Sequence, residues 1–445
     1  MKNNFPNKKT KNPIPEYSNS KEEINKSIKN QNKKIPFIEF KGSNYFRLKI
    51  AYSFLLNKPI KISEIRSESI NPGLTKYEIS FLKLISSITN GTEITINQTG
   101  TLLTLIPGTI TNNYGDNIKF DCDKSRNITY YTEGLIPICL FGKESLHINL
   151  TGITNNNIDN SVDSFKMSTC VLLQKLIIGD LVEFKILKRG VLPNGIGEIY
   201  FKIPIITFIS PFDWIDEGKI KKIRGIAFTS KLSSIYIKQM IDSSRGILNN
   251  FLPDVWISED IYKDKDLNKI SPGYGLTLCA ETKNGFCFCT DKINDIENIE
   301  KTANEISKEC TLQFINDIYS SGCCNVNNQG LFLFLMALSE KNYVSKMKIG
   351  KITEFTKGVL KFIDKYLGVK FHIRECDDYD KEDSESSENE KEENEENEKE
   401  ENEDEEKEEN ENDEKENEDL PILHKQYMFS CIGIGLRNVA RIELQ

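Results

Sequence analysis

Apolar residues follow two alternating spacings along the chain, which predict helices and strands in turn. A spacing of three to four residues, as for Phe46, Ile50 and Phe54, indicates the buried face of a helix. Alternation at every second residue indicates a half-buried strand. From residue 36 to residue 106 the expected order is strand, helix, strand, helix and two strands: 36–40, 43–56, 60–65, 75–89, 94–97 and 101–106. This order predicts one β-α-β-α-β-β unit.

Similar segments recur later in the chain. A helix at 162–178 and a strand at 181–187 indicate a second unit. Towards the end, helix, strand, helix and strand follow one another: 328–338, 346–349, 353–366 and 369–373. Units that recur roughly every 70 to 110 residues predict structural repetition.

The section 217–321 has a different pattern, with a helix at 233–251, strands at 255–257 and 275–282, and a long helix at 299–319. We interpret it as a smaller inserted domain. The expected fold class is therefore α/β, with three β-α-β-α-β-β units in a large domain and a smaller α/β domain inserted in it.

Two low-complexity segments interrupt this pattern, and both lack the apolar residues that a core requires. We expect a disordered basic tail at 1–34 and a disordered acidic insertion at 377–420. The remaining boundaries follow from these: the first part of the core, the inserted domain, and the two pieces of the last part of the core are 35–216, 217–321, 322–376 and 421–445.

The net charge of −9 averages two unlike regions. Residues 377–420 contain 27 acidic residues and 5 lysines, a net charge of −22, so the rest of the 445-residue chain carries +13. A mildly basic body favours nucleic acid among the possible partners. The acidic segment has two interpretations: a tolerated low-complexity expansion, or a polyanion that contacts basic proteins or competes with RNA for the basic body.

Several classes of protein are disfavoured. No run of eighteen apolar residues predicts a membrane span, and the first residues lack the apolar segment of a signal peptide, so we expect a cytosolic or nuclear protein. The 11 cysteines are odd in number and scattered through apolar segments, which is typical of reduced, buried thiols. The close pairs Cys287/Cys289 and Cys323/Cys324 lack the spacing that zinc prefers, so we expect no metal and no other cofactor.

The sequence also offers no recognisable catalytic motif. It has no P-loop, and Gly433-Ile434-Gly435 is better explained as a turn after a strand than as a phosphate loop. His147 and His372 alternate with apolar residues on predicted strands, which favours half-buried strand positions over catalytic bases.

Four short segments combine glycine with arginine at the ends of predicted elements: KGSNYFR (41–47), IRSESINPGL (65–74), KRGVLPNGIGE (188–198) and KKIRG (221–225). Glycine lets a backbone approach a phosphate closely, and arginine binds phosphate through two parallel hydrogen bonds. Each segment alone is better explained as a turn with an exposed arginine. Together they predict an anion- or RNA-binding surface whose candidate residues are Gly42, Asn44, Arg47, Arg66, Arg189 and Arg224.

The same segments carry a family resemblance. Residues 41–91 resemble the opening of the RNA 3′-terminal phosphate cyclase superfamily, and later segments continue the resemblance in order: TGTLLTLIPGTI (99–110), TGITNNNIDNSVD (151–163), RGVLPNGIGE (189–198), KIKKIRGIAF (219–228), SPGYGLTLCAET (271–282), NNQGLFLFLMAL (327–338) and CIGIGLRN (431–438). The resemblance covers nearly the whole chain except the basic tail and the acidic insertion.

Two departures place the chain with the cyclase-like branch of that superfamily rather than with the true cyclases. The Gly-Gly-Gly-Gln-x-x-Arg string of the cyclases corresponds here to residues 41–47, in which Gln becomes Asn44 while Arg47 is kept. Alignment from Phe371 places Phe355 at the histidine that the cyclases adenylylate. A phenyl ring has no nucleophilic atom, and no histidine lies between His147 and His372.

The resemblance implies a pseudo-enzyme of the nucleus and nucleolus. It implies a role in early pre-18S rRNA processing for the small ribosomal subunit, with a ribosome-assembly GTPase, pre-rRNA and components of the small-subunit processome as partners. It also implies that the former active-site cleft, lined by the four candidate arginines, persists as an anion or RNA site. The alternative is an active ATP-dependent RNA 3′-phosphate cyclase, or an RNA-processing endonuclease on the same scaffold.

Overall fold

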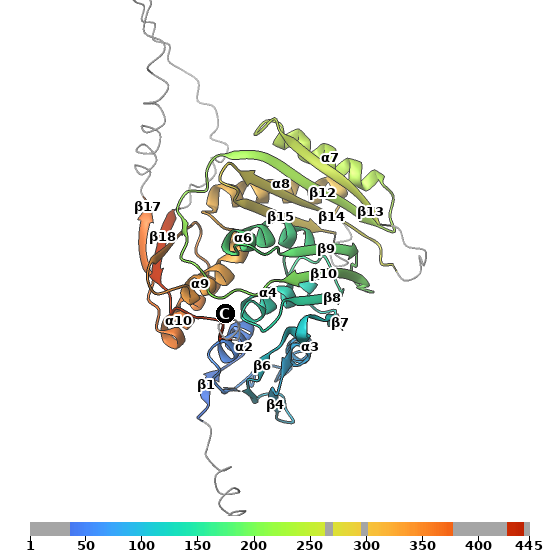
Figure 1. Ribbon diagram of the computed structural model, residues 1–445. Coiled ribbons are helices and arrows are strands. Elements are labelled where there is room, and N and C mark those ends of the chain that lie inside the picture. The colour runs from blue at the N-terminus through green and yellow to red at the C-terminus, as the bar shows by residue number, and fades with distance from the viewer. Residues whose placement is uncertain (1–35, 263–269, 295–300, 377–424, 440–445) are drawn as a thin grey trace, which may run out of the picture.

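The computed structural model describes residues 36–262, 270–294, 301–376 and 425–439 (Figure 1). Four four-stranded sheets, one two-stranded ribbon and the helices that cover them make up this part of the chain. The expected mixed α/β class is confirmed. The tail predicted at 1–34 and the insertion predicted at 377–420 lie outside the described residues.

The first sheet is formed near the start of the described chain by alternating helices and strands. Its elements are β1 (Ile38–Lys41), α2 (Phe46–Leu55), β2 (Ile60–Ser63), α3 (Lys76–Ile88), β4 (Glu93–Ile96) and β5 (Leu103–Ile106). The strand order is β1-β2-β5-β4, and only β1 and β2 are parallel. Ile60 and Ile62 are buried while Lys61 and Ser63 face outward, as the period of two in the sequence requires. A ribbon of β3 (Thr89–Asn90) and β6 (Thr109–Ile110) follows, and then the short 3₁₀ turn η1 (Asn112–Gly115).

Two more sheets repeat this strand order. The second contains β7 (Asn117–Asp121), α4 (Ile128–Cys139), β8 (Leu146–Gly152), α5 (Val162–Ser164), the π-helical turn η2 (Phe165–Thr169), α6 (Cys170–Leu176), β9 (Glu183–Lys188) and β10 (Gly197–Ile203), in the order β7-β8-β10-β9. The third contains β11 (Asp213–Trp214), η4 (Val326–Asn328), α9 (Gln329–Leu338), β16 (Val344–Ile349), α10 (Glu354–Leu367), β17 (His372–Cys376) and β18 (Gln426–Ile432), in the order β11-β16-β18-β17. In each sheet the first two strands are parallel and the other pairs are antiparallel.

The fourth sheet has another order and lies, in the sequence, between β11 and α9 of the third sheet. Its elements are β12 (Ile220–Ser230), α7 (Ile235–Leu248), β13 (Val255–Tyr262), β14 (Gly273–Thr282), β15 (Cys287–Ile293) and α8 (Ala303–Ser320). The strand order is β13-β12-β14-β15. In Figure 1 this sheet and its two helices lie at the top of the molecule, away from the first sheet.

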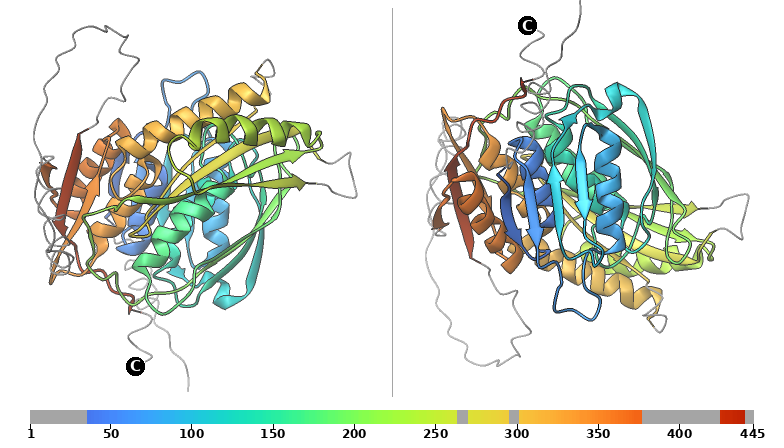
Figure 2. Two further views of the ribbon diagram at one scale, coloured as in Figure 1. Left: turned by 90° about the horizontal axis from the view of Figure 1, so that it is seen from above. Right: turned by 90° about the horizontal axis from the view of Figure 1, so that it is seen from below.

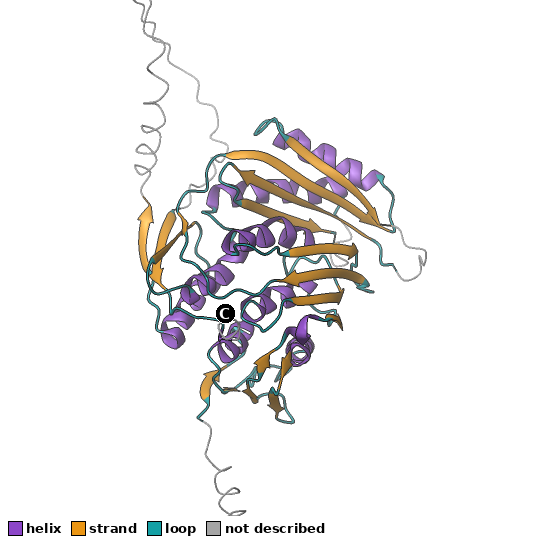
Figure 3. Ribbon diagram, in the orientation of Figure 1, coloured by secondary structure: helices purple, strands orange, loops and turns teal. Residues whose placement is uncertain are grey.

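The helices of the first three sheets meet in the middle of the molecule, and their strands lie around them (Figure 3). Helix α2 packs on α4, α4 contacts α9, and α9 packs on α10. All ten residues of α9 are buried, which explains why its sequence QGLFLFLMAL is apolar on every face. The two views in Figure 2 show the third sheet at one side of these helices and the second sheet at the other. This central contact places residues from three sheets next to one another.

The segment KKIRG is not at the end of an element, as the sequence analysis expected, but inside β12. This strand is eleven residues long and pairs with both β13 and β14. Its apolar residues alternate with lysine and arginine, so Ile223 is buried while Lys222 and Arg224 point the other way. The alternation of buried and solvent-facing residues, rather than Gly225, indicates that this segment lies within a strand.

A buried arginine joins the fourth sheet to the second unit. The guanidinium of Arg189, which follows β9, donates two hydrogen bonds of 2.6 and 2.9 Å to the carboxylate of Asp163 in α5. Its Nε donates a third, of 2.6 Å, to Asp260 in β13. Burial alone lowers the pKa of Arg189, but the two carboxylates outweigh that effect and raise it. The side chains of Arg189 and Asp163 are 4 % and 1 % exposed, so the ion pair is shielded from water.

We expect Arg189→Met to lower the free energy of unfolding by about 3–5 kcal/mol, because it leaves the carboxylate of Asp163 buried without its cation. Urea denaturation followed by circular dichroism measures this change. Arg224→Met is the matched control, since Arg224 also forms a two-bond ion pair, with Asp254, but in solvent. Equal shifts of the unfolding midpoint in the two variants would contradict the structural role of Arg189.

Candidate functional site

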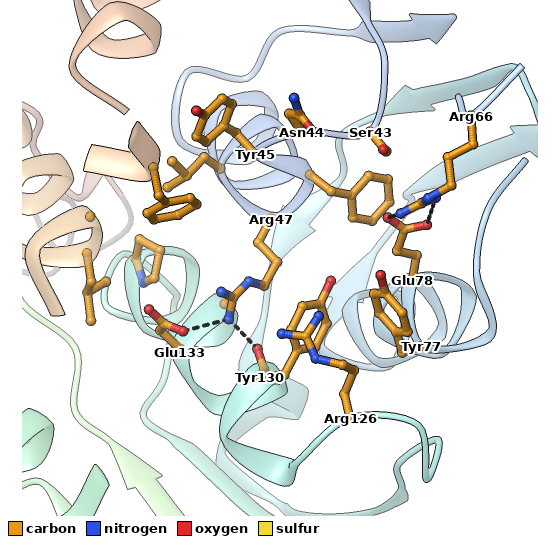
Figure 4. Close-up of a pocket in the computed structure, with 17 residues that line it drawn as sticks. Ser43, Asn44, Tyr45, Arg47, Arg66, Tyr77, Glu78, Arg126, Tyr130 and Glu133 are labelled. Carbon is orange, nitrogen blue, oxygen red and sulfur yellow. Dashed lines mark hydrogen bonds and ion pairs between the residues drawn. The ribbon is translucent and has the colours of Figure 1, made fainter. Parts of the chain in front are cut away.

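A pocket of about 250 Å³ opens where the helices of the first three sheets meet (Figure 4). Its lining comes from the segment before α2 and the start of that helix, from the loop before α3, from α3 and α4, and from α9 and α10. The lining residues are Ser43, Asn44, Tyr45, Phe46, Arg47, Leu48, Arg66, Tyr77, Glu78, Arg126, Tyr130, Glu133, Gly134, Pro137, Gly330, Leu331 and Phe355. We call it the central pocket.

The loop before α2 is held in a fixed shape. Gly42 and Tyr45 have left-handed backbone conformations, with φ of 67° and 58°, which turn the chain into the helix. The ammonium group of Lys49 donates to the carbonyl oxygens of Lys41 and Gly42 at 3.1 and 2.7 Å. Burial lowers the pKa of Lys49 to about 8, although Glu78 opposes this effect. The hydrogen bonds from Lys49 therefore fix the backbone at the start of the segment KGSNYFR.

Arg47 and Arg66 point into the central pocket, each beside a carboxylate. Arg47 donates to Glu133 at 2.8 Å and to the backbone carbonyl of Tyr130 at 2.7 Å. Arg66 makes two bonds of 2.7 Å to Glu78, which is buried in α3. Arg66 also has a φ of 47°, a conformation that non-glycine residues seldom adopt. Strain of this kind is often found at functional sites.

A third arginine, Arg126, lies just before α4. Its guanidinium forms a two-bond pair with Asp159 and stacks against two tyrosine rings, 4.5 Å from the centroid of Tyr130 and 5.1 Å from that of Tyr77. Arg47 lies 4.4 Å from the same Tyr130 ring. The two arginines thus share the tyrosine between them, as Figure 4 shows.

Phe355 and Tyr45 form the aromatic wall on the α10 side. Their ring centroids are 5.4 Å apart, and Phe355 is 49 % exposed. The ring of Phe355 passes so close to Gly330 that a Cβ there would lie 2.7 Å from its Cε1. Glycine at position 330 therefore lets α9 and the ring approach each other.

The structure brings together some of the predicted candidate residues and separates others. Asn44, Arg47 and Arg66 line the central pocket, and Gly42 belongs to the loop above it. The expectation that Arg189 and Arg224 line the same cleft is wrong. The buried carboxylate of Asp163 and the partly exposed one of Asp260 hold Arg189 at the fourth sheet. Arg224 pairs with Asp254 at 2.8 and 3.1 Å on that sheet.

The sequence analysis missed Arg126 and the tyrosines Tyr77 and Tyr130. Arg126 has no glycine beside it, and α4 was not among the expected elements. The signal that was present is the string SRNITYY, in which Asn127 caps a helix: its side chain accepts a hydrogen bond from the N–H of Thr129. An arginine directly before such a cap projects at the start of the helix.

A second pocket, of about 320 Å³, lies beside the first. Its lining is rich in amide side chains: Asn156, Asn157, Asn160, Gln313, Asn316, Asn325 and Asn327. It also contains Asp291 of β15, whose carboxylate accepts from the N–H of Ser161 at 3.2 Å. Desolvation raises the pKa of Asp291 to about 7; the hydrogen bond from Ser161 opposes this, and the charge of Asp163 adds to it.

In the described part of the chain, no three His, Cys, Asp or Glu side chains are grouped so that they could hold a metal ion. No helix in that part has the length and apolar character needed to span a membrane.

Asp291→Asn should stabilise the fold at pH 8 and have less effect at pH 5. The pKa of Asp291 is higher in the folded than in the unfolded protein, so ionisation of this carboxyl lowers the free energy of unfolding. This destabilisation is absent below the unfolded-state pKa of about 4, grows as the pH rises, and is complete above about pH 7. Urea unfolding at several pH values between 5 and 8 measures the difference between the variant and the parent protein. A difference that does not change with pH would contradict the assignment.

Comparison with known proteins identifies the family. Residues 38–373 match the family described as RNA 3′-terminal phosphate cyclase. A probable RNA 3′-terminal phosphate cyclase-like protein of Dictyostelium discoideum is 38 % identical over 348 residues, covering 76 % of this chain and 93 % of that protein. The human RNA 3′-terminal phosphate cyclase-like protein is 37 % identical over 339 residues, covering 76 % and 90 %. The Schizosaccharomyces pombe rRNA processing protein rcl1 is 33 % identical over 315 residues, covering 70 % and 85 %. These matches confirm the resemblance, and the chain belongs to the RNA 3′-terminal phosphate cyclase family.

Proposed function

We propose that this protein is a non-catalytic factor of small-ribosomal-subunit biogenesis. It supports early pre-18S rRNA processing in the nucleolus by binding a ribosome-assembly GTPase and pre-rRNA, among other components of the small-subunit processome. The names of its relatives support this proposal: several are called cyclase-like, and the Schizosaccharomyces pombe relative is called an rRNA processing protein.

The observation that carries the non-catalytic assignment is the phenyl ring of Phe355 in the central pocket. Counting back from Phe371, we take Phe355 as the counterpart of the histidine with which the cyclases attack ATP. Its ring lies at the pocket wall beside Tyr45, but carbon atoms of a phenyl ring cannot form a phosphoramidate with AMP.

No imidazole or thiol in the lining of the central pocket takes the place of the missing nucleophile. The lining of the central pocket contains neither histidine nor cysteine. His147 is on β8, where its Nδ1 lies 2.8 Å from the Tyr200 hydroxyl, and His372 is on the edge strand β17. His424 lies outside the described residues.

We expect the purified protein to acquire no AMP label from α-labelled ATP and magnesium, and to form no cyclic end on a 3′-phosphorylated RNA. The physical reason is the absence of a nucleophile at position 355. Gel electrophoresis of the protein and chromatography of the digested RNA measure the two products. Covalent AMP on the protein would mean that another residue replaces the histidine, and would overturn the non-catalytic assignment.

The arginines of the central pocket support RNA as a ligand. Guanidinium groups bind RNA through phosphates, base edges and stacking, and Arg47 and Arg66 are 22 % and 24 % exposed despite their carboxylate partners. A ligand entering the pocket can therefore reach them.

Arg47→Glu combined with Arg66→Glu should weaken binding of pre-rRNA or of the GTPase by roughly tenfold or more. Each substitution replaces a cation in the pocket by an anion that lies beside an existing carboxylate. Filter binding measures RNA affinity, and calorimetry with the GTPase measures the second interaction. Lys119→Glu with Lys185→Glu, on the exposed face of the second sheet, is the control of equal charge change. Unchanged affinity for both partners in the arginine variant would refute the site.

A further inference from the structure

The arginines of the central pocket already have carboxylate partners. Each of its three guanidinium groups is hydrogen-bonded to a carboxylate of its own: Arg47 to Glu133, Arg66 to Glu78, and Arg126 to Asp159. The nearby ammonium group of Lys49 is buried and donates to backbone carbonyls. A terminal phosphate, which carries close to two negative charges at neutral pH, would meet the lining carboxylates of Glu78 and Glu133 and would compete with Asp159 for Arg126. No guanidinium group in the lining of the pocket is therefore free of a carboxylate partner and available to select such an end.

The aromatic rings that line the pocket differ in how far other side chains cover their faces. Arg126 covers faces of both Tyr77 and Tyr130, and Arg47 also lies over Tyr130. Phe355 is different, because half of its surface is exposed and its aromatic neighbour Tyr45 lies to one side at a tilt of 36°. Exposed aromatic rings in a nucleic-acid pocket are platforms on which bases stack. Phe355 is thus the ring left for a ligand.

Polar groups for the edge of a planar ligand line the same pocket as this ring. Ser43 and Asn44 line the pocket from the anchored loop before α2, as Figure 4 shows. Asn44 is exposed, and an amide side chain both donates to and accepts from the edge of a base. The volume of about 250 Å³ lies below the range of ordinary small-molecule pockets, which fits one planar ring system better than a larger ligand.

We infer that the central pocket binds an unpaired nucleobase of a single-stranded RNA segment, stacked on Phe355, and does not select a phosphorylated RNA end. The inference rests on the proposed function, because it requires that the protein binds RNA. It gives the phenyl ring a positive role: the side chain that removes the nucleophile also supplies the stacking surface.

The test uses the full-length protein and a 12-nucleotide oligouridine that carries one central 2-aminopurine and a 5′ fluorescein. Fluorescence anisotropy measures affinity, and quenching of 2-aminopurine reports stacking. The parent protein should quench the base and bind the 3′-hydroxyl and 3′-phosphate forms of the RNA within about twofold of each other. Phe355→Ala should abolish the quenching and weaken binding by roughly 5- to 150-fold, the range expected for one stacked base.

Three variants and a modified RNA make the result specific. Phe355→Trp should keep both quenching and affinity, because it keeps a ring. Tyr343→Ala removes a 71 % exposed ring beside β16 that does not line the pocket, and should bind like the parent protein. The parent protein and Phe355→Ala should bind with equal affinity to an RNA that has an abasic site in place of 2-aminopurine. Circular dichroism and the urea midpoint establish that each variant is folded.

Two results would overturn the inference while leaving the proposed function intact: equal RNA affinity of the parent protein and Phe355→Ala, or a tenfold or greater preference for the 3′-phosphate. Failure of the parent protein to bind any of these RNAs would instead overturn the inference together with the RNA-binding part of the proposed function.

Discussion

The central pocket exists because the helices of three sheets must bury their apolar surfaces against one another. Helix α9 is the clearest case, since all of its residues are buried and no face is left for solvent. It can reach that state only between α4 and α10, which contribute from the second and third sheets. The same contact brings Glu133 of α4, Gly330 of α9 and Phe355 of α10 to one cavity. The site is thus a consequence of how the core is closed.

Buried arginines in this protein are tied to carboxylates, and those ion pairs also connect parts of the chain. Arg47 of the first sheet pairs with Glu133 of the second unit, and Arg189 joins the second unit to β13 of the fourth sheet. A charge taken out of water needs such a partner, because its lost hydration is expensive. An arginine beside glycine in the sequence is therefore not evidence of a free cation. At the central pocket the paired guanidinium groups stay partly exposed to solvent, whereas the paired side chain of Arg189 is almost fully buried.

Under the proposed function, the family scaffold changes its chemistry at this pocket through one side chain. In the proposed role, the cavity contains arginines and aromatic rings and presents a phenyl group in place of the nucleophile of the cyclases. A ring without a reactive atom still offers surface for stacking, and its exposure of 49 % makes that surface available. Loss of catalysis and retention of binding are then properties of the same residue.

The sequence by itself determined the properties that depend on local pattern and on residue identity. Spacings of two and of three to four residues predicted the mixed α/β class and most of the helices and strands near the central pocket, because each element buries its own apolar face. Motifs in a constant order identified the family, and the absence of histidine between His147 and His372 followed from reading the chain. The tertiary structure decided which charges meet. Asp163 and Asp260 lie 26 and 71 residues from Arg189, and Glu133 lies 86 residues from Arg47, so no local spacing encodes these pairs. Only the packing of sheets and helices selects the partner of each arginine, and with it the difference between a structural ion pair and a candidate binding site.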